Sequence, residues 1–202
     1  MADREEPKAA GPAAPAGQET SDEELLSAFL RGEREMFTAL VQRYERPLYG
    51  YLCRLTGSAE EADDVFQETF LQVWRKADSF RGASTFRTWL YAVAINVSRS
   101  RARRRRGRPD AGPFPAEQAN GAAGPDGQAQ AREVGRLIAG AVGRLPAEQR
   151  EVFVLRAYEE MTYPEIADSV GRPLGTVKSQ MRLALARLQR DLTELGRAWD
   201  IA

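Results

Sequence analysis

The stretch TYPEIADSVGRPLGTVKSQMRLALARL, residues 162–188, decides the fold because it reads as two short helices joined by a tight turn. Thr162 followed three residues later by Glu165 forms a capping box, which marks the start of a helix. Ala167 is small enough for a second helix to cross close to it, and Gly171 lies where the chain must reverse. This order of features is typical of a helix-turn-helix motif.

The second helix of this motif presents side chains of the types that bind DNA. Its outward residues are Thr176, Lys178, Ser179, Gln180 and Arg182. Glutamine bonds adenine, and lysine or arginine bonds guanine, in the major groove. Residues 172–190 contain five basic side chains and no acidic one, so a DNA groove would meet a positive face. The alternative is an ordinary helical hairpin with a polar surface. The capping box, the small residue, the turn glycine and the second helix without acidic residues together disfavour it.

The net charge of the 202-residue chain is zero, but its charges are unevenly distributed. Residues 1–24 contain seven acidic and two basic residues, whereas residues 99–108 contain seven arginines and no acidic residue. Such a basic patch attracts phosphates or another polyanion, although a solvated charged segment or a targeting tag has the same composition. The sequence therefore excludes a globally basic nucleic-acid binder and leaves open a locally basic one.

The composition removes several classes of function. The chain has no histidine, so it has no Ser-His-Asp or Cys-His catalytic triad and lacks the usual zinc ligands. Its one cysteine, Cys53, excludes an internal disulfide. No apolar run approaches the roughly 18 residues of a membrane helix, and the polar, acidic N-terminus has no signal-peptide pattern. We expect a soluble cytoplasmic protein without a bound metal or cofactor.

The chain divides into two helical pieces. Residues 1–19 are rich in Ala, Pro, Gly and charge and are expected to form a disordered tail. Residues 107–131 contain five Gly, four Pro and seven Ala, which is typical of a flexible linker. Residues 20–106 and 132–196 show apolar residues at helical spacing. The sequence thus predicts an all-α protein of two small helical domains, which the linker allows to bind separated places on one partner.

Local signals place the helices of these pieces. Capping boxes at Ser21–Glu24 and Ser58–Glu61 begin two helices. Pro47 is expected to interrupt the apolar stripe between them. A further helix starts near Phe86 and runs into the arginines, and the last helix is predicted to span residues 174–188.

Acidic and apolar residues crowd the helix that follows Ser58. Asp63, Asp64, Gln67 and Glu68 line one flank of that helix, with Glu60 and Glu61 just before them. The apolar residues Phe66, Leu71 and Trp74 are expected beside these acids. Acids in the opening turns of a helix are stabilised by its dipole, so ordinary surface acids are the simplest interpretation. Clustered carboxylates also suit a metal-dependent nuclease, and acids beside exposed apolar side chains suit a basic partner helix.

The helix that starts near Phe86 interleaves basic and aromatic side chains. It and the loop before it hold Phe80, Phe86, Trp89, Tyr91, Asn96, Arg99 and Arg103. Arginines hold the phosphate backbone, and aromatic rings stack on unpaired bases, so the pattern suits single-stranded or opening DNA. At least some of the aromatic residues are expected to be core residues instead.

Four segments together resemble a known family. They are DDVFQETFLQVW (63–74), FRTWLYAVAINVSRSRARR (86–104), LPAEQREVFVLR (145–156) and YPEIADSVGRPLGTVKS (163–179). Their order is similar to that of bacterial RNA polymerase sigma factors of the extracytoplasmic-function (ECF) group, which retain regions 2 and 4. The resemblance implies a non-enzymatic transcription initiation factor, with region 2 in residues 20–106 and region 4 in residues 132–196.

The resemblance also implies partners for these surfaces. The helix of residues 63–74 would dock on the beta-prime clamp helices of core RNA polymerase, with the beta flap as a second contact. The minus-10 element of promoter DNA would meet Phe80, Ser84, Thr85, Asn96, Arg99 and Arg103. The minus-35 element would meet Arg172, Thr176, Lys178, Ser179, Gln180 and Arg182. An anti-sigma factor is the expected regulator, because such factors are common in the family.

Two alternatives to this interpretation stay open on the residues alone. A helix-turn-helix regulator that acts as a dimer shares the C-terminal motif but leaves residues 58–106 without a role, and a pull-down with core polymerase discriminates it. A carboxylate-metal nuclease would show magnesium-dependent cleavage that is lost in Asp64→Asn.

For a sigma factor, the acidic start of the chain leads us to expect weak DNA binding by the free protein.

The sequence departs from the family pattern at positions near the DNA. Ser100 stands where the family usually has Asp, Gln180 where Arg is common, and Leu183 and Leu185 where arginines are usual. We therefore predict an altered minus-35 preference, because lost arginines remove base and phosphate contacts. Selection of promoters from a random library measures that preference, and a preference unchanged from the family pattern would contradict the prediction.

Overall fold

The computed structural model describes residues 20–105 and 125–199, and within these residues the chain forms eight α-helices and one short 3-10 helix. In chain order they are α1 (Asp22–Leu30), α2 (Arg34–Thr56), α3 (Ala59–Lys76), η1 (Ala77–Ser79), α4 (Phe86–Arg105), α5 (Pro125–Gly143), α6 (Ala147–Ala157), α7 (Tyr163–Val170) and α8 (Leu174–Trp199). The predicted all-helical class is confirmed. The predicted tail and residues 107–124 of the predicted linker lie outside the described residues.

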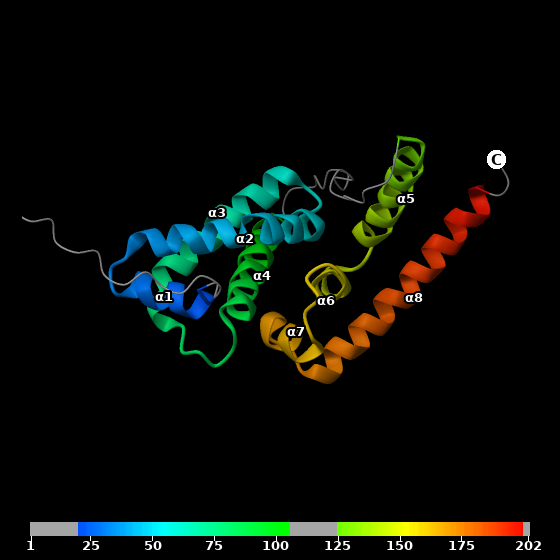
Figure 1. Cartoon of the computed structure of the whole chain (residues 1–202). Helices are drawn as coiled ribbons and strands as arrows, with labels where there is room; N and C mark the ends of the chain where they lie inside the picture. The colour runs from blue at the N-terminus through cyan, green and yellow to red at the C-terminus, as the bar shows by residue number, and fades with distance from the viewer. Residues whose placement is uncertain (1–19, 106–124, 200–202) are drawn as a thin grey trace, which may run out of the picture.

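Helices α1–α4 pack together as the N-terminal region (Figure 1). They enclose a core of large apolar side chains. Leu40, Leu48 and Tyr51 of α2 are fully buried, as are Leu90 and Tyr91 of α4. Each such side chain contributes about 1.5–3 kcal/mol on burial, so this core outweighs the weak intrinsic stability of the separate helices. The result is a rigid support for the outer faces of α3 and α4.

Two predicted capping signals begin helices of this region. Ser21 Oγ accepts a hydrogen bond from the Glu24 amide at 3.2 Å, and the Glu24 carboxylate accepts one from the Ser21 amide at 2.8 Å. Ser58 Oγ accepts from the Glu61 amide at 3.3 Å at the start of α3. Both predicted starts are confirmed, because each oxygen binds an amide that the helix leaves without a partner.

The prediction that Pro47 interrupts a helix was wrong, because α2 runs through it for 23 residues. A proline inside a helix removes one backbone hydrogen bond and costs about 3 kcal/mol. Tyr44 and Leu48 on either side of it are buried in the core. Their burial exceeds the cost of the proline, so tertiary packing overrides the local signal.

The C-terminal region, α5–α8, contains the predicted helix-turn-helix as α7 and α8. Thr162 and Glu165 form both bonds of the capping box. Gly171 ends α7 with a φ of 65°, a left-handed conformation that favours glycine. Ile166 and Val177 are fully buried where α7 and α8 pack together. The predicted motif is therefore present, with its turn where the sequence placed it.

Two helix boundaries differ from the expectations. Helix α5 begins at Pro125, inside the stretch 107–131 that was predicted to be linker. Proline is favoured in the first turn of a helix, and the Ala, Gln and Arg residues that follow are good helix formers. Helix α8 continues beyond residue 188 to Trp199. Composition alone overestimated the length of the linker, because counts of glycine and proline ignore where in the stretch these residues lie.

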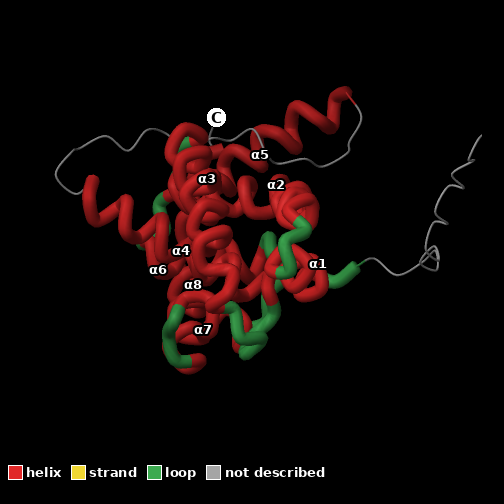
Figure 2. The backbone as a smooth tube through the Cα atoms, turned by 90° about the vertical axis from the view of Figure 1, so that its left-hand side faces the viewer, coloured by secondary structure: helices red, strands yellow, loops and turns green. Residues whose placement is uncertain are grey.

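The two regions pack against each other, which the sequence did not predict. Helix α4 contacts α7, and α2 contacts α5 and α6. Figure 1 shows α7 beside α4, and Figure 2 shows the same neighbourhood in a view turned by 90°. Buried apolar residues of both regions form one continuous cluster. The described parts of the chain therefore form one body rather than two separate modules.

The capping box of α7 yields a prediction about stability. Replacement of Thr162 by Ala removes the oxygen that binds the Glu165 amide, and we expect a loss of about 1 kcal/mol in the free energy of unfolding. Thr193→Ala is the matched control, because its hydroxyl bonds only the carbonyl of Gln189 within α8. Equal stability of both variants in urea unfolding would contradict the prediction.

The same site predicts a dependence on pH. Hydrogen bonds from the Thr162 hydroxyl and amide hold the pKa of Glu165 below its usual range. A carboxyl with a depressed pKa stabilises the fold above its unfolded-state pKa, and this contribution is lost as the pH falls through the folded-state pKa. The deficit of Thr162→Ala should therefore shrink in acid, as urea unfolding at several pH values would show.

Candidate nucleic-acid and protein interfaces

The predicted interface residues of α3 lie along its outer side. Asp63, Asp64, Gln67, Leu71 and Trp74 are exposed, at helical spacings that place them on one side of α3. The two other candidates, Phe66 and Glu68, are half-buried. The structure thus brings five of the seven candidates to one surface, which is acidic at the start of the helix and apolar at its end.

The apolar end of this surface is supported by a cluster of aromatic rings. The Trp74 ring centroid lies 4.6 Å from that of Phe29 and 4.8 Å from that of Phe37, and Trp74 remains 44% exposed. Leu71 is 51% exposed and Leu30 of α1 is 50% exposed. We call Leu30, Leu71 and Trp74 the α1–α3 patch. Exposed apolar residues beside a rigid aromatic cluster are typical of a protein-binding surface.

The acidic end of α3 is held by neighbouring helices. The Asp64 carboxylate forms an ion pair with Arg101 of α4. Burial raises the pKa of Tyr49 to about 12, and the nearby charges of Cys53 and Asp63 add to the shift. Among the residues that the structure describes, no group of three acidic or cysteine side chains is placed to hold a metal ion. The nuclease alternative therefore has no supporting geometry there.

The loop before α4 supports an aromatic cluster. Phe80 is half-buried, with its ring centroid 5.4 Å from Trp89 and 6.2 Å from Phe86. Thr85 Oγ1 accepts a hydrogen bond from the Thr88 amide at 3.2 Å, so this candidate caps α4. Ser84 is half-buried beside it. Helix capping thus gives Thr85 a structural role whether or not it binds a ligand.

The minus-10 candidates on α4 lie along a strip rather than at one point. Thr85, Trp89, Asn96 and Arg103 are four or seven residues apart and share one side of the helix. The ends of this strip are about 27 Å apart at the rise of an α-helix. Asn96 and Arg103 are exposed, and Trp89 is half-buried. Trp89, which the sequence left between core and surface, thus joins this strip.

Arg99 is not free, because the C-terminal region binds its guanidinium. Arg99 donates to both carboxylate oxygens of Glu151, at 2.7 and 3.0 Å, and to the carbonyl of Val170 at 3.0 Å. The Glu151 side chain is only 6% exposed. No pattern in the sequence predicts this pairing, since only long-range packing brings residues 99 and 151 together.

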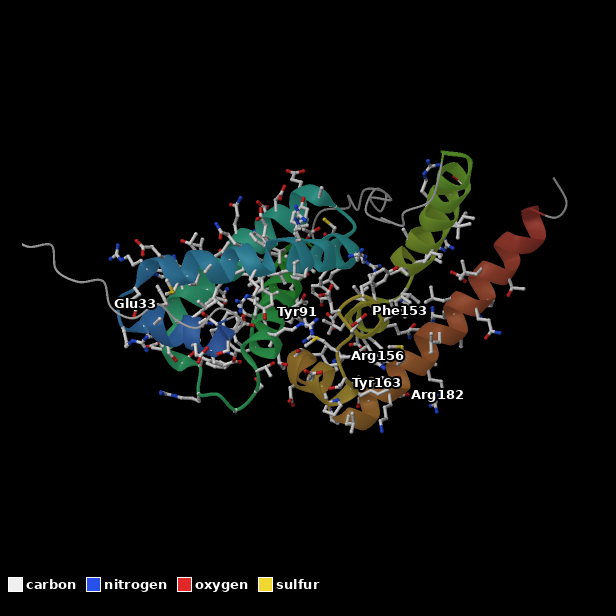
Figure 3. All side chains as sticks on the ribbon, in the orientation of Figure 1. Glu33, Tyr91, Phe153, Arg156, Tyr163 and Arg182 are labelled. Atoms are coloured by element: carbon white, nitrogen blue, oxygen red, sulfur yellow. The ribbon has the colours of Figure 1, made fainter. Side chains whose placement is uncertain are left out.

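A second carboxylate of the C-terminal region is buried against α4. Glu159 accepts a hydrogen bond from the Tyr91 hydroxyl, and Arg87 lies 3.7 Å from the same carboxylate. Burial raises the pKa of Glu159, and the bond from Tyr91 and the charge of Arg87 oppose that rise. Figure 3 shows Tyr91 between the two regions. No pattern in the sequence predicts the contact of Glu159 with Tyr91 and Arg87 either.

The DNA-reading candidates of the helix-turn-helix are partly exposed. Lys178 and Arg182 of α8 are exposed, and Figure 3 shows Arg182 on the side of α8 that faces away from α6. Thr176, Ser179 and Gln180 are half-buried. Arg172 is bound by Glu148 at 2.6 Å, and this hydrogen bond lowers the pKa of Glu148. The structure therefore leaves Lys178 and Arg182 as the accessible cations among these candidates.

Further apolar side chains are exposed in the C-terminal region. Leu183 is 45% exposed and Leu185 is 51% exposed on α8. Val134 and Ile138 of α5 and Leu192 of α8 are also exposed, and α5 contacts α8. We call these last three residues the α5–α8 patch. No described helix is long and apolar enough to cross a membrane.

Comparisons with known proteins identify similar chains. The family model for sigma-70 region 2 matches residues 40–108, and that for sigma-70 region 4 matches residues 135–188. The RNA polymerase sigma-H factor of Pseudomonas aeruginosa is 31% identical over 185 residues, covering 87% of this chain and 96% of the relative. The ECF RNA polymerase sigma-E factor of Escherichia coli K12 is 30% identical over 173 residues, covering 81% and 90%.

Two solved structures have a similar fold. CnrH in complex with the cytosolic domain of CnrY gives a TM-score of 0.64 at 26% identity, covering 86% of this chain and 97% of that chain. The sigma factor RpoE of Bartonella quintana, in complex with the anti-sigma factor NepR, gives a TM-score of 0.64 at 24% identity, covering 78% and 96%. In both cases the likeness extends over most of each chain.

Proposed function

Because this chain belongs to the ECF group of RNA polymerase sigma factors, which direct promoter-specific initiation of transcription, we propose how its own surfaces divide that work. The outer side of α3 binds core RNA polymerase. The strip on α4 reads the minus-10 element, and α8 reads the minus-35 element. The protein is not an enzyme, and it acts in the cytoplasm, where polymerase meets the chromosome.

The α1–α3 patch and the acids beside it favour α3 as the polymerase-binding surface. Leu71 and Trp74 offer apolar area at one end of the helix, and Asp63 and Asp64 offer negative charge at the other. A hydrophobic anchor flanked by charge fits a basic partner helix, because the charges steer the encounter and the apolar area holds the complex. The clamp helices of the beta-prime subunit are the proposed partner.

The strip on α4 has the chemistry that an opened minus-10 element needs. Trp89 and Phe80 supply aromatic faces, and Asn96 and Arg103 supply exposed polar groups along the same helix. Stacking on an aromatic ring contributes about 1–3 kcal/mol per base, which is comparable to the cost of unpairing a base pair. Polymerase contacts supply the remainder, so the strip captures bases that the complex has opened.

The helix-turn-helix has the chemistry for a duplex minus-35 element. Lys178 and Arg182 are exposed cations near the start of α8 that can meet phosphates and base edges. Leu183 and Leu185 replace charged contacts by apolar ones, which suit the methyl group of thymine. The α5–α8 patch is the proposed contact with the beta flap of polymerase, because it is a separate exposed apolar surface.

The proposed domain organisation follows the same division. Residues 1–19 form a tail, residues 20–106 form region 2, a linker leads to α5, which begins at Pro125, and region 4 extends to residue 196. The region 4 model, residues 135–188, lies within the second of these regions, and the region 2 model, residues 40–108, ends two residues beyond the first. An anti-sigma factor is the proposed regulator, since the solved relative from Bartonella quintana was captured with one.

One observation carries the proposal: a chain with both sigma regions in order also exposes an apolar and acidic surface on α3. Run-off transcription tests it. The purified chain, added to core RNA polymerase and a library of promoter templates, should direct RNA synthesis from discrete start sites. Polymerase that starts no discrete RNA with the chain would contradict the proposal.

The α1–α3 patch yields a prediction about polymerase affinity. Leu71→Asp places a charge in the centre of the proposed interface, and we expect the affinity for core polymerase to fall by about tenfold or more, a loss of about 1.4 kcal/mol. Leu183→Asp makes the same change at a similarly exposed leucine of α8 and should leave that affinity unchanged. Fluorescence anisotropy with labelled protein measures both, and equal losses would refute the assignment.

A further inference from the structure

Helix α8 is covered on one side and exposed on the other. Its buried side chains are Val177, Met181, Ala184 and Leu188, at spacings of three and four residues that place them on one side of the helix. Helices α5, α6 and α7 all contact α8, and Figure 1 shows all three on the same side of it. The opposite side is exposed and is therefore open to a ligand.

The open side of α8 carries two arginines that lie beyond the minus-35 candidates. Arg187 and Arg190 are both exposed. They follow Leu183 by four and seven residues, and Ser179 precedes it by four, so these residues share one side of the helix. Within the side chains that the structure describes, no carboxylate pairs with the guanidinium of Arg187 or Arg190. Both charges are thus available to an anionic partner.

The first acidic residue of α8 is held away from this open side. Asp191 is half-buried, and its carboxylate accepts a hydrogen bond at 3.2 Å from Arg144, which follows α5 on the covered side. This ion pair balances the charge of Asp191. Residues 172–190 contain no acidic residue. The field along the open side of α8 is therefore positive as far as Arg190.

This positive side is longer than a DNA groove is wide. From Thr176 to Leu183 the helix rises by about 10 Å, which matches a major groove about 12 Å wide. Arg187 lies about 6 Å beyond Leu183 along the helix axis, and Arg190 lies about 10 Å beyond it. Because the N-terminal residues of a recognition helix contact the base edges, these two arginines reach the edge of the groove, where the phosphates lie.

The middle of the open side has no charge that could hold a phosphate there. Leu183 is 45% exposed and can contact the methyl group of thymine, but it cannot bind a phosphate. Lys178 and Arg182 lie nearer the start of α8. Phosphate binding at the far edge of the groove therefore depends on Arg187 and Arg190. Arginine suits this contact, because its guanidinium binds phosphate through two parallel hydrogen bonds.

We propose that Arg187 and Arg190 are positioning residues that hold the DNA backbone at the far edge of the major groove of the minus-35 element. They fix the register of α8 on the duplex, and the residues before them then meet the bases. The contact carries no sequence information of its own, because the phosphates are the same at every base pair. This inference rests on the proposed role of α8 in minus-35 recognition.

Arg187→Gln and Arg190→Gln test the contact, with Arg136→Gln as their matched control. Each substitution removes one exposed positive charge from region 4, but Arg136 lies on α5 beside Glu133. The probe is a labelled duplex of a promoter found by run-off transcription, bound by the chain together with core polymerase. Fluorescence anisotropy gives the affinity at several salt concentrations between about 50 and 200 mM.

The expected result is a change in salt dependence. Each α8 variant should reduce the slope of log affinity against log salt by about 0.9, because one fewer phosphate is neutralised. Arg136→Gln should keep the wild-type slope. Glutamine is a good helix former, and both α8 positions are exposed, so the variants should keep the fold. Unchanged slopes in both α8 variants would overturn the proposal in favour of an acidic protein partner for these arginines.

A second duplex separates a backbone contact from base recognition. It carries the same promoter with the minus-35 element replaced by another sequence. The double variant Arg187→Gln/Arg190→Gln should bind both duplexes more weakly by the same factor, on the order of tenfold. Leu183→Ala should weaken binding to the intact element only. A larger loss on the intact element than on the replaced one in the double variant would overturn the backbone role.

The free chain on a random-sequence duplex at low salt gives a test that needs no promoter. Phosphate contacts do not depend on sequence, so the double variant should bind this duplex more weakly than wild type, and Arg136→Gln should not. Equal affinities of all three proteins would overturn the proposal. Absence of discrete RNA from the wild-type chain with core polymerase would contradict the proposed function instead, and the random-sequence duplex would then decide the phosphate contact alone.

Discussion

Helix α4 is the element on which the rest of the structure depends, because it is packed on two sides at once. Leu90 and Tyr91 are fully buried, and α4 contacts α3 in the N-terminal region and α7 in the C-terminal region. The same helix holds the arginines and the aromatic strip proposed for DNA. A helix that serves both a core and a ligand surface cannot offer all of its faces at once, so its packing against α3 and α7 leaves only Asn96, Arg103 and their neighbours exposed.

The other surfaces do not share this conflict. The α1–α3 patch is exposed, and so are Lys178 and Arg182 of α8, although α4 and α7 pack together. The proposed polymerase surface and the proposed minus-35 surface are therefore available at the same time. Arg99 and Arg172 are paired with carboxylates, so fewer cations attract DNA to the free protein. The zero net charge of the chain acts in the same direction.

Local signals predicted most of the fold, and long-range packing explains the rest. The capping residues Ser21 and Thr162 and the turn at Gly171 act within one helical turn, so their effects are readable from sequence. Pro47 predicted an interruption that the structure does not have, because the burial of its neighbours stabilises α2 through that position. The exposed face of α3 was predictable from periodicity. The engagement of Arg99 was not, since no pattern within α4 records a partner more than fifty residues away.

Photo-cross-linking to core polymerase tests the central claim most directly. A photoreactive amino acid is placed at Gln67 on α3 or, as the matched control, at Gln189 on α8, both exposed positions. The account predicts that position 67 joins the chain to the beta-prime subunit and that position 189 does not. Equal cross-linking of that subunit from both positions, or none from position 67, would contradict it.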